Sequence, residues 1–167
     1  MSNKTLTQDE AVDKLKTMAE GIDFAMLATN LDSRPLHMVP MSTKTVGADG
    51  SIWFLSGRDS EHNRHIQNSS QVHLIYSDAS AMRFLNVFGT ASIHDDEVTL
   101  QKLYQDSDDA WFDGIHDSNL TAIQVNPTDA FYWDPRDGKL VTLLKLGVAA
   151  LTGNQPDVID QGKLELD

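Results

Sequence analysis

The segment SGRDSEHNRH, from Ser56 to His65, gathers the side chains of this chain that are best suited to bind an anion. Its basic and imidazole side chains are those of Arg58, His62, Arg64 and His65. The hydroxyls of Ser56 and Ser60 can donate hydrogen bonds to phosphate oxygens. This clustering is unusual here, because 13 Lys and Arg stand against 25 Asp and Glu, a formal net charge of −12. The segment is therefore a candidate phosphate site.

A helix start is expected to position these side chains. An apolar strand precedes them, and Asp59 or Ser60 can cap a helix that begins at this point. The first N–H groups of such a helix, near Ser60 and Glu61, have no partner within the helix and favour an anion. A second interpretation stays open, because Asp59 and Glu61 offset both arginines: the segment is then a solvated helix whose Ser and Asp only cap it.

A metal site is a further alternative for the same helix. His62 and His65 are three residues apart on one helix face, with Glu61 beside them, and could share a divalent ion. The sequence contains no second recognisable ligand pair, whereas structural zinc normally takes four ligands, so we predict no metal site. No Gly-x-Ser-x-Gly elbow occurs either. Lone histidines in strands, such as His37 and His73, are typical of sheet residues, and no catalytic residue is assigned.

Composition limits the classes of partner. The chain has 167 residues, 40% of them hydrophobic, which predicts a single domain over 1–167. Its acidic balance disfavours nucleic acid and anionic membranes, since both bind mainly through Lys and Arg. There is no cysteine, and no apolar run has the length of a signal peptide or a membrane span. We therefore expect a cytoplasmic protein that binds neither nucleic acid nor a membrane.

Short apolar segments separated by turn residues predict six strands. They cover residues 24–30, 35–42, 51–57, 71–78, 83–94 and 121–134. Asp49-Gly50 suits a hairpin turn, which predicts that the strands at 35–42 and 51–57 are antiparallel neighbours. Helices are expected after a Thr7 and Glu10 capping box up to Gly21, near residues 60–69, and near 95–105.

These elements favour a mainly β fold, an antiparallel barrel or an α+β layer, over a doubly wound sheet. The first helix should bury Val12, Leu15, Ala19 and Ile22, and the last should turn Val98, Leu100 and Leu103 inward. The core should span about residues 8–152. The polar tail, 153–167, should lie on the surface, with one late edge strand at 163–166.

The segments RPLHMVPM, DGSIWFLSGRDSEHNRHIQNSSQVHLIYSD, FLNVFGTASI, WFDGI and AFYWD occur in this order along the chain. Over residues 8–152 this order resembles the general stress protein 26 group of the pyridoxamine 5'-phosphate oxidase-like FMN-binding split barrels. The resemblance implies a six-stranded antiparallel split barrel with flanking helices. It also implies a homodimer with one FMN in each of two clefts at the dimer interface.

Position by position, the resemblance places the phosphate at Ser56, Ser60 and His62. His62 stands where the family usually has lysine, and Val39 stands where it usually has arginine. The strand from Met38 to Met41 would run along the edge of the flavin ring, and Trp111 would approach the flavin of the partner subunit. The cofactor-binding residues expected in this way are Met38, Val39, Pro40, Met41, Leu55, Ser56, Arg58, Ser60, Glu61, His62 and Trp111.

The activity implied is that of an FMN-dependent oxidoreductase of unknown substrate, with a small-molecule redox partner. The alternative is a stress-response module that binds flavin, or none, without turnover. Oxidation of pyridoxamine phosphate itself is disfavoured, because residues 140–167 contain only Lys145 and Lys163 as cations. A deazaflavin or haem in the same cleft stays an alternative to FMN.

A homodimer is also indicated by the strand at 51–57. Ile52 and Phe54 lie on one face, and Trp53 and Leu55 lie on the other, so both faces are apolar. One small barrel cannot cover that much apolar surface, and a partner subunit would bury the surplus. The alternative is that the helices of the same chain cover it.

Overall fold

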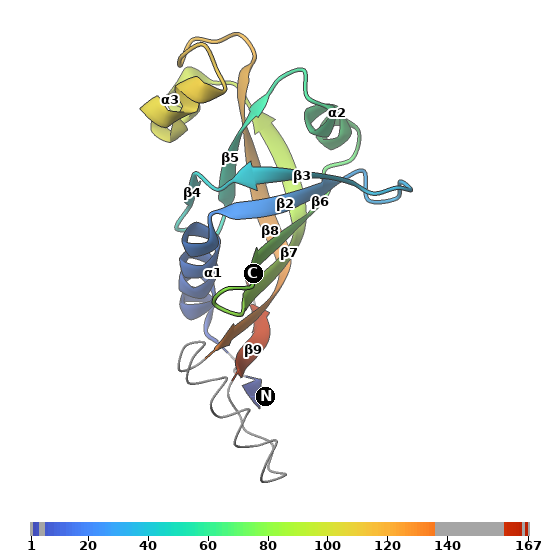
Figure 1. Cartoon of the computed structure of the whole chain (residues 1–167), viewed down its shortest axis with the longest axis vertical. Coiled ribbons are helices and arrows are strands. Elements are labelled where there is room, and N and C mark those ends of the chain that lie inside the picture. Colours follow the sequence, from blue (N-terminus) through green and yellow to red (C-terminus); the bar gives the residue numbers. More distant parts are fainter. Residues whose placement is uncertain (1, 4–5, 136–158, 165, 167) are drawn as a thin grey trace.

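The computed structural model describes residues 2–3, 6–135, 159–164 and 166. Its centre is a curled sheet in which β3, β2, β6, β7 and β8 follow one another as antiparallel neighbours (Figure 1). The strands are β1 (Ser2–Asn3), β2 (Phe24–Thr29), β3 (His37–Ser42), β4 (Thr45–Val46), β5 (Ile52–Gly57), β6 (Gln71–Asp78), β7 (Arg83–His94), β8 (Leu120–Pro135) and β9 (Ile159–Leu164). All six strands expected from the sequence are present, and the mainly β, antiparallel split-barrel architecture is confirmed.

The long strand β8 closes one side of the barrel. Its first half pairs with β5 as well as β7, and its second half pairs with β7 and β9. Because β5 pairs with β8 and β4, no ladder among the described strands joins β5 to β3. The sheet is therefore split between β3 and β5, and this opening is where the candidate site lies.

The hairpin at Asp49-Gly50 differs from the prediction. Gly50 does adopt a positive φ of 80°, but the ladder that leads into the turn contains only Thr45 and Val46 of β4, paired with Trp53 and Ile52. The strand β3 pairs with β2 instead. The prediction that 35–42 and 51–57 are antiparallel neighbours was wrong, because the chain leaves β3 after Ser42 and starts a separate short strand before the turn.

Within the described ranges, three α-helices and one 3₁₀ helix flank the sheet: α1 (Gln8–Ile22), α2 (Glu61–Asn68), α3 (Glu97–Leu103) and η1 (Asp106–Ala110). The Thr7 and Glu10 capping box of α1 is confirmed. This helix ends at Ile22, one residue beyond Gly21, and Asp23 takes the positive φ of 71° that follows. None of the helices in the described ranges is long and apolar enough to cross a membrane.

The helix α3 corrects one expected core residue. Leu100 and Leu103 are buried, but Val98 is 63% exposed. Two residues advance an α-helix by about 200°, so Val98 lies on the face opposite Leu100. The buried pair packs on Leu120 and Ala122 of β8, in a small cluster outside the main core.

The C-terminal part of the chain adds a strand that is longer than expected. β9 starts at Ile159 and lies between β8 and β1, pairing with β1 in parallel. Leu164 is buried in the main core, so residues 159–164 are not a surface tail with an edge strand at 163–166. Residues 153–158 lie outside the described part.

Candidate functional site

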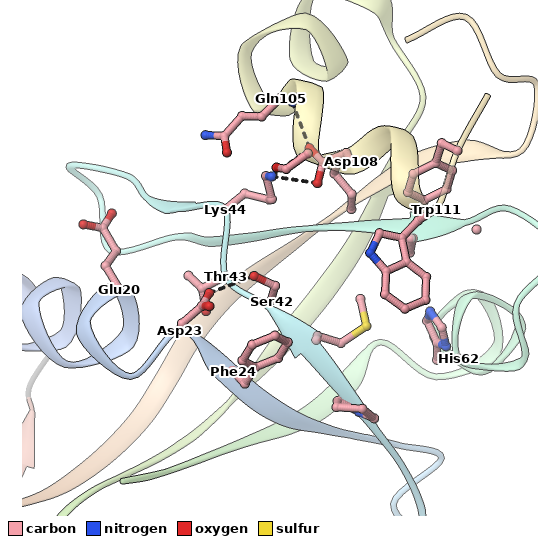
Figure 2. Close-up of a pocket in the computed structure, with 17 residues that line it drawn as sticks. Glu20, Asp23, Phe24, Ser42, Thr43, Lys44, His62, Gln105, Asp108 and Trp111 are labelled. Carbon is pink, nitrogen blue, oxygen red and sulfur yellow. Dashed lines mark hydrogen bonds and ion pairs between the residues drawn. The ribbon is translucent and has the colours of Figure 1, made fainter. Parts of the chain in front are cut away.

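A cavity of about 810 Å³ opens between β3, β5, the start of α2 and the segment at 105–112 (Figure 2). Its size is within the range of small-molecule and cofactor sites. Pro40 and Met41 of β3 form one wall, and Leu55 and Ser56 of β5 form another. Because β3 and β5 are not paired here, the wall strands leave a gap that a flat ligand can enter.

Trp111 stands at the edge of this cavity with 83% of its surface exposed. It lies on the same side as His62, at the first turn of α2 (Figure 2). Phe24, 59% exposed, borders the cavity from the start of β2. Two large exposed aromatic side chains thus border the same opening, and exposed apolar surface that gathers at one place marks a contact region.

The first turn of α2 is fixed by Ser60, its N-cap. The backbone N–H of Asn63 donates to Ser60 Oγ at 3.2 Å. This bond uses an oxygen lone pair and leaves the hydroxyl proton of Ser60 able to donate elsewhere. The N–H groups of Glu61 and His62 belong to the first helical turn, where no intrahelical acceptor exists. The helix start therefore offers donors to an anion.

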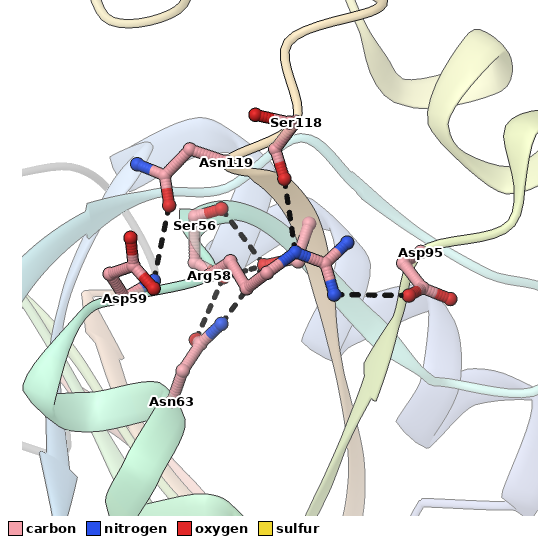
Figure 3. Close-up of polar contacts among 8 residues, drawn as sticks. Ser56, Arg58, Asp59, Asn63, Asp95, Ser118 and Asn119 are labelled. Atoms are coloured by element: carbon pink, nitrogen blue, oxygen red, sulfur yellow. Dashed lines mark hydrogen bonds and ion pairs between the residues drawn. The ribbon is translucent and has the colours of Figure 1, made fainter.

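A buried polar network locks α2 to the sheet (Figure 3). Ser56 Oγ donates to Asn63 Oδ1 at 2.9 Å, and Asn63 Nδ2 donates to Thr121 Oγ1 at 2.9 Å. Thr121 Oγ1 donates in turn to the Ser56 carbonyl at 2.9 Å. All three residues are buried. The Ser56 hydroxyl proton is thus committed to Asn63, although Ser56 lines the cavity.

Arg58 does not line the cavity, and its guanidinium is bound by residues outside it (Figure 3). Its Nε donates to the Ser118 carbonyl at 3.0 Å, and its Nη1 donates to Asp95 Oδ2 at 3.2 Å. Asp95 neutralises its charge, and Arg58 ties the loop before α2 to the segment before β8. Arg64 is exposed on α2 and does not line the cavity. Neither arginine is therefore placed to meet an anion inside it.

Two of the histidine rings near the start of α2 are in direct contact. The rings of His37 and His65 meet edge to face, with centroids 4.9 Å apart. Glu61 lies between them, 3.6 Å from His37 Nδ1 and 3.8 Å from His65 Nε2. His65 Nδ1 is also 2.9 Å from the hydroxyl of Thr29, which is buried. His65 is therefore held by contacts inside the protein.

His62 has a different environment. Its Nε2 is buried and has no hydrogen-bond partner within the described residues, and the ring lines the cavity. Burial lowers the pKa of His62, and the nearby His37 and His65 lower it further. His62 is therefore a neutral imidazole near pH 7, and its Nε2 has no hydrogen-bond partner among the described residues.

The opposite end of the cavity is acidic. Lys44 donates to both oxygens of Asp108, at 2.7 and 3.0 Å, and this pair holds η1 against the end of β3. Asp23 accepts from Ser42 Oγ at 2.7 Å, and Glu20 also lines this end (Figure 2). Lys44 is paired with Asp108, and Glu20 lies 4.0 Å from Lys16 Nζ, so Asp23 is the carboxylate at this end without a cation among the described residues. An anionic group is therefore favoured only at the His62 end.

Of the cofactor-binding residues expected from the sequence, the cavity is lined by Pro40, Met41, Leu55, Ser56, His62 and Trp111. The others lie beside it and do not line it: Met38, Val39, Arg58, Ser60 and Glu61. The structure adds Asp23, Phe24, Lys44 and Asp108, which the sequence analysis missed. They come from three separate parts of the chain, at 23–24, 44 and 108, and no local sequence motif indicates that these parts meet. In the described ranges no three His, Asp or Glu side chains converge in a way suited to a metal ion.

Comparison with solved structures supports this architecture. A protein named as a general stress protein 26 from Jannaschia sp. CCS1 aligns with a TM-score of 0.76 at 21% identity, over 95% of this chain and 99% of that chain. The general stress protein 26 from Bacillus anthracis str. Sterne gives a TM-score of 0.64 at 23% identity, over 72% of this chain and 92% of that one. The general stress FMN/FAD binding protein from Xanthomonas citri gives 0.65 at 21% identity, over 77% and 90%. At these identities the likeness shows a shared fold.

The family comparison covers most of the sequence. No curated protein matches the chain. A family model described as pyridoxamine 5'-phosphate oxidase like matches residues 10–157, which include the walls of the cavity and the whole of α2. The chain therefore belongs to the pyridoxamine 5'-phosphate oxidase-like family.

Proposed function

We propose that this protein binds FMN in the cavity between β3, β5 and α2 and acts as a flavin-dependent oxidoreductase. The observation that carries the proposal is the buried, unpartnered Nε2 of His62 in the wall of a cofactor-sized cavity. The similar proteins include one named for FMN/FAD binding, from Xanthomonas citri. Bound FMN would supply hydride transfer at its ring system.

The residues present fit such a group. His62 and the first N–H groups of α2 would hold the phosphate, and the Ser60 hydroxyl retains a proton to donate to it. Ser56 would position this helix start through Asn63, because its own proton is already donated. The ring would lie along Pro40 and Met41 of β3, with its phosphate far from the carboxylates of Asp23 and Glu20.

The proposal predicts saturable quenching of flavin fluorescence when FMN is titrated into the purified protein. His62→Ala and Ser60→Ala should each weaken binding, by about tenfold or less, because each removes one hydrogen-bond donor from a charged group. A matched control is Ser107→Ala, which removes a hydroxyl from the acidic side of the same cavity and should leave affinity unchanged. Protein that neither quenches FMN nor retains any flavin on purification contradicts the proposal and directs attention to a deazaflavin or haem.

A flavin-binding module without turnover is the second candidate. The polar side chains that line the cavity favour this candidate, because they are already bonded to one another. Lys44 donates to Asp108, and Asp23 accepts from Ser42. No acid and base pair is thus left poised for proton transfer among the described lining residues. Sustained reduction of bound FMN by NADH or NADPH would exclude this candidate, and tight binding without reduction would support it.

We also propose that a second copy of the chain covers the apolar strip formed by Phe24, Met26, Ile75 and Phe84. Met26 on β2 and Ile75 on β6 are cross-strand partners that face outward and are partly exposed. Phe24 at one end of this strip also borders the cavity, so the same partner would complete the site. This arrangement agrees with the interface cleft that the resemblance implies.

The dimer proposal predicts twice the chain mass in light scattering coupled to size exclusion. Ile75→Lys should shift the protein toward monomer and weaken FMN binding, because a charge in the centre of the strip opposes its burial. Val98→Lys is the matched control, since Val98 is an exposed apolar residue of α3 outside the strip. A monomeric parent protein, or a dimer that Ile75→Lys leaves intact, would refute the assignment of this strip.

A further inference from the structure

His62 differs from the other polar residues of the cavity because its Nε2 is buried without a hydrogen-bond partner in the described part of the chain. Its ring lines the cavity on the side of Trp111 (Figure 2). By contrast, Ser56 and Lys44, which also line the cavity, donate to neighbouring side chains. A buried polar atom without a partner is uncommon, and in a cavity wall it points to an acceptor supplied by a ligand.

Among the described residues, no carboxylate forms an ion pair with His62. Glu61 is the nearest acidic neighbour in sequence, but its two oxygens face His37 and His65, at 3.6 and 3.8 Å. The titratable and charged groups around His62 are His37 of β3, then Glu61, Arg64 and His65 of α2, then Glu20, Asp23, Lys44 and Asp108 in the cavity wall. Protonation of His62 in the free protein would therefore place a charge between two other imidazoles.

The pKa of His62 reflects this environment, since burial lowers it first and the two neighbouring imidazoles lower it further. A phosphate group placed against Nε2 would raise the pKa of His62 again, because it provides an opposite charge and a hydrogen-bond acceptor. The proton affinity of the ring and the affinity for phosphate are then linked, and the coupling acts equally in both directions. A lysine at this position would keep its charge throughout the neutral range and show no such coupling.

We propose that phosphate binding at this site is coupled to uptake of a proton by His62, so that the protein holds a phosphate monoester more tightly as the pH falls below neutrality toward 6.5. The proposal rests on the proposed function, because FMN is the phosphate monoester that the cavity would take. It makes His62 a sensor of pH as well as a ligand of the phosphate.

The ligand-free protein should show the opposite dependence. Because the pKa of His62 is lower in the folded chain than its ordinary value of 6.5, the unfolded chain binds more protons just below that pH. The contribution of His62 to stability is therefore fully present above pH 6.5 and is lost as the pH falls through the lowered pKa. A lower pH thus reduces the folding stability of the ligand-free protein but increases its affinity for the phosphate.

The test is an FMN titration, followed by fluorescence at constant ionic strength, at about pH 6.5, 7.5 and 8.5. The dissociation constant should fall about fivefold between the highest and lowest pH, which is the change expected when on average about a third of a proton is taken up on binding across these two pH units. His62→Lys should bind tightly and His62→Gln weakly, both with little dependence on pH. His116→Gln is the matched control, because His116 is exposed and outside the cavity wall.

A second readout does not depend on affinity. The imidazole NMR signal that disappears in His62→Gln identifies His62, and its pKa should rise when FMN is added. Equal FMN affinity at all three pH values, or wild-type pH dependence retained in His62→Gln, would overturn the proton coupling while leaving the FMN proposal intact. Failure to bind FMN at every pH would overturn both.

Discussion

Replacing Gly89 with alanine is expected to destabilise the fold by about 3 kcal/mol or more, since it forces a methyl group into backbone. An added Cβ would lie 2.3 Å from the carbonyl oxygen of Asn126 and 3.0 Å from Pro127 Cα. These atoms belong to β8, which cannot withdraw, because β7 is paired with β8 on one edge and with β6 on the other. Urea unfolding at a fixed protein concentration measures the loss.

The position of Gly89 explains why the sheet needs a glycine there. The register of β7 against β8 shifts between Phe88 and Gly89, and Thr128 is the extra residue of the bulge. Such a bulge bends the strand, and here it separates the half of β8 that pairs with β5 from the half that pairs with β9. The bend therefore helps to hold β5, and with it one wall of the cavity, in place.

Gly21→Ala is the matched control, with an expected effect of opposite sign. Gly21 lies in the last turn of α1, and an added Cβ would meet only the end of the Arg83 side chain, at 3.5 Å. Alanine is the better helix former, so this variant should be stabilised by about 1 kcal/mol. If Gly89→Ala unfolds at the same urea concentration as the parent, the close approach of β7 and β8 is not rigid and the argument fails.

The strands were predictable because each carries its own pattern. In β5, for example, Ile52 and Phe54 alternate with Trp53 and Leu55, and Gly57 follows. The pairing of the strands was harder to predict. The turn signal at Asp49-Gly50 predicts the turn, but it does not predict how many residues pair on either side of it. β9 was underestimated for a related reason, since its segment is polar and is ordered by pairing with β8. Strand pairing decided both outcomes, and a single sequence does not show which strands will pair.

The candidate site shows the same division between local and tertiary information. Ser60 as the cap of α2 and His62 in its first turn follow from a local pattern, and the structure confirms these two positions in the helix. The direction of Arg58 does not follow from the sequence, because its partners Ser118 and Asp95 are brought near only by the fold. Of the four basic and imidazole residues that are clustered in the sequence, only His62 lines the cavity.

Asn63 is the second position at which a single substitution should have a large effect. Asn63→Ala is expected to cost about 3 kcal/mol, because it removes a buried amide that is only 1% exposed, leaves its two hydrogen-bond partners unsatisfied and creates a small void. The hydroxyl of Ser56 would lose its acceptor, and Thr121 would lose a donor. Thermal or urea unfolding gives the stability change. FMN titration of the folded variant should show weaker binding as well, since Asn63 sets the position of the helix start.

Two comparisons separate this network from a general effect of changing α2. Asn68→Ala alters an exposed amide at the other end of the helix and should change stability by less than about 0.5 kcal/mol. Thr121→Val should cost less in the Asn63→Ala background than in the parent, because the donor to Thr121 Oγ1 is then already absent. Strictly additive losses would mean that the two side chains act independently. In that case the start of α2 would owe its position to apolar contacts such as that of the buried Ile66, and the phosphate end of the cavity would tolerate loss of Asn63.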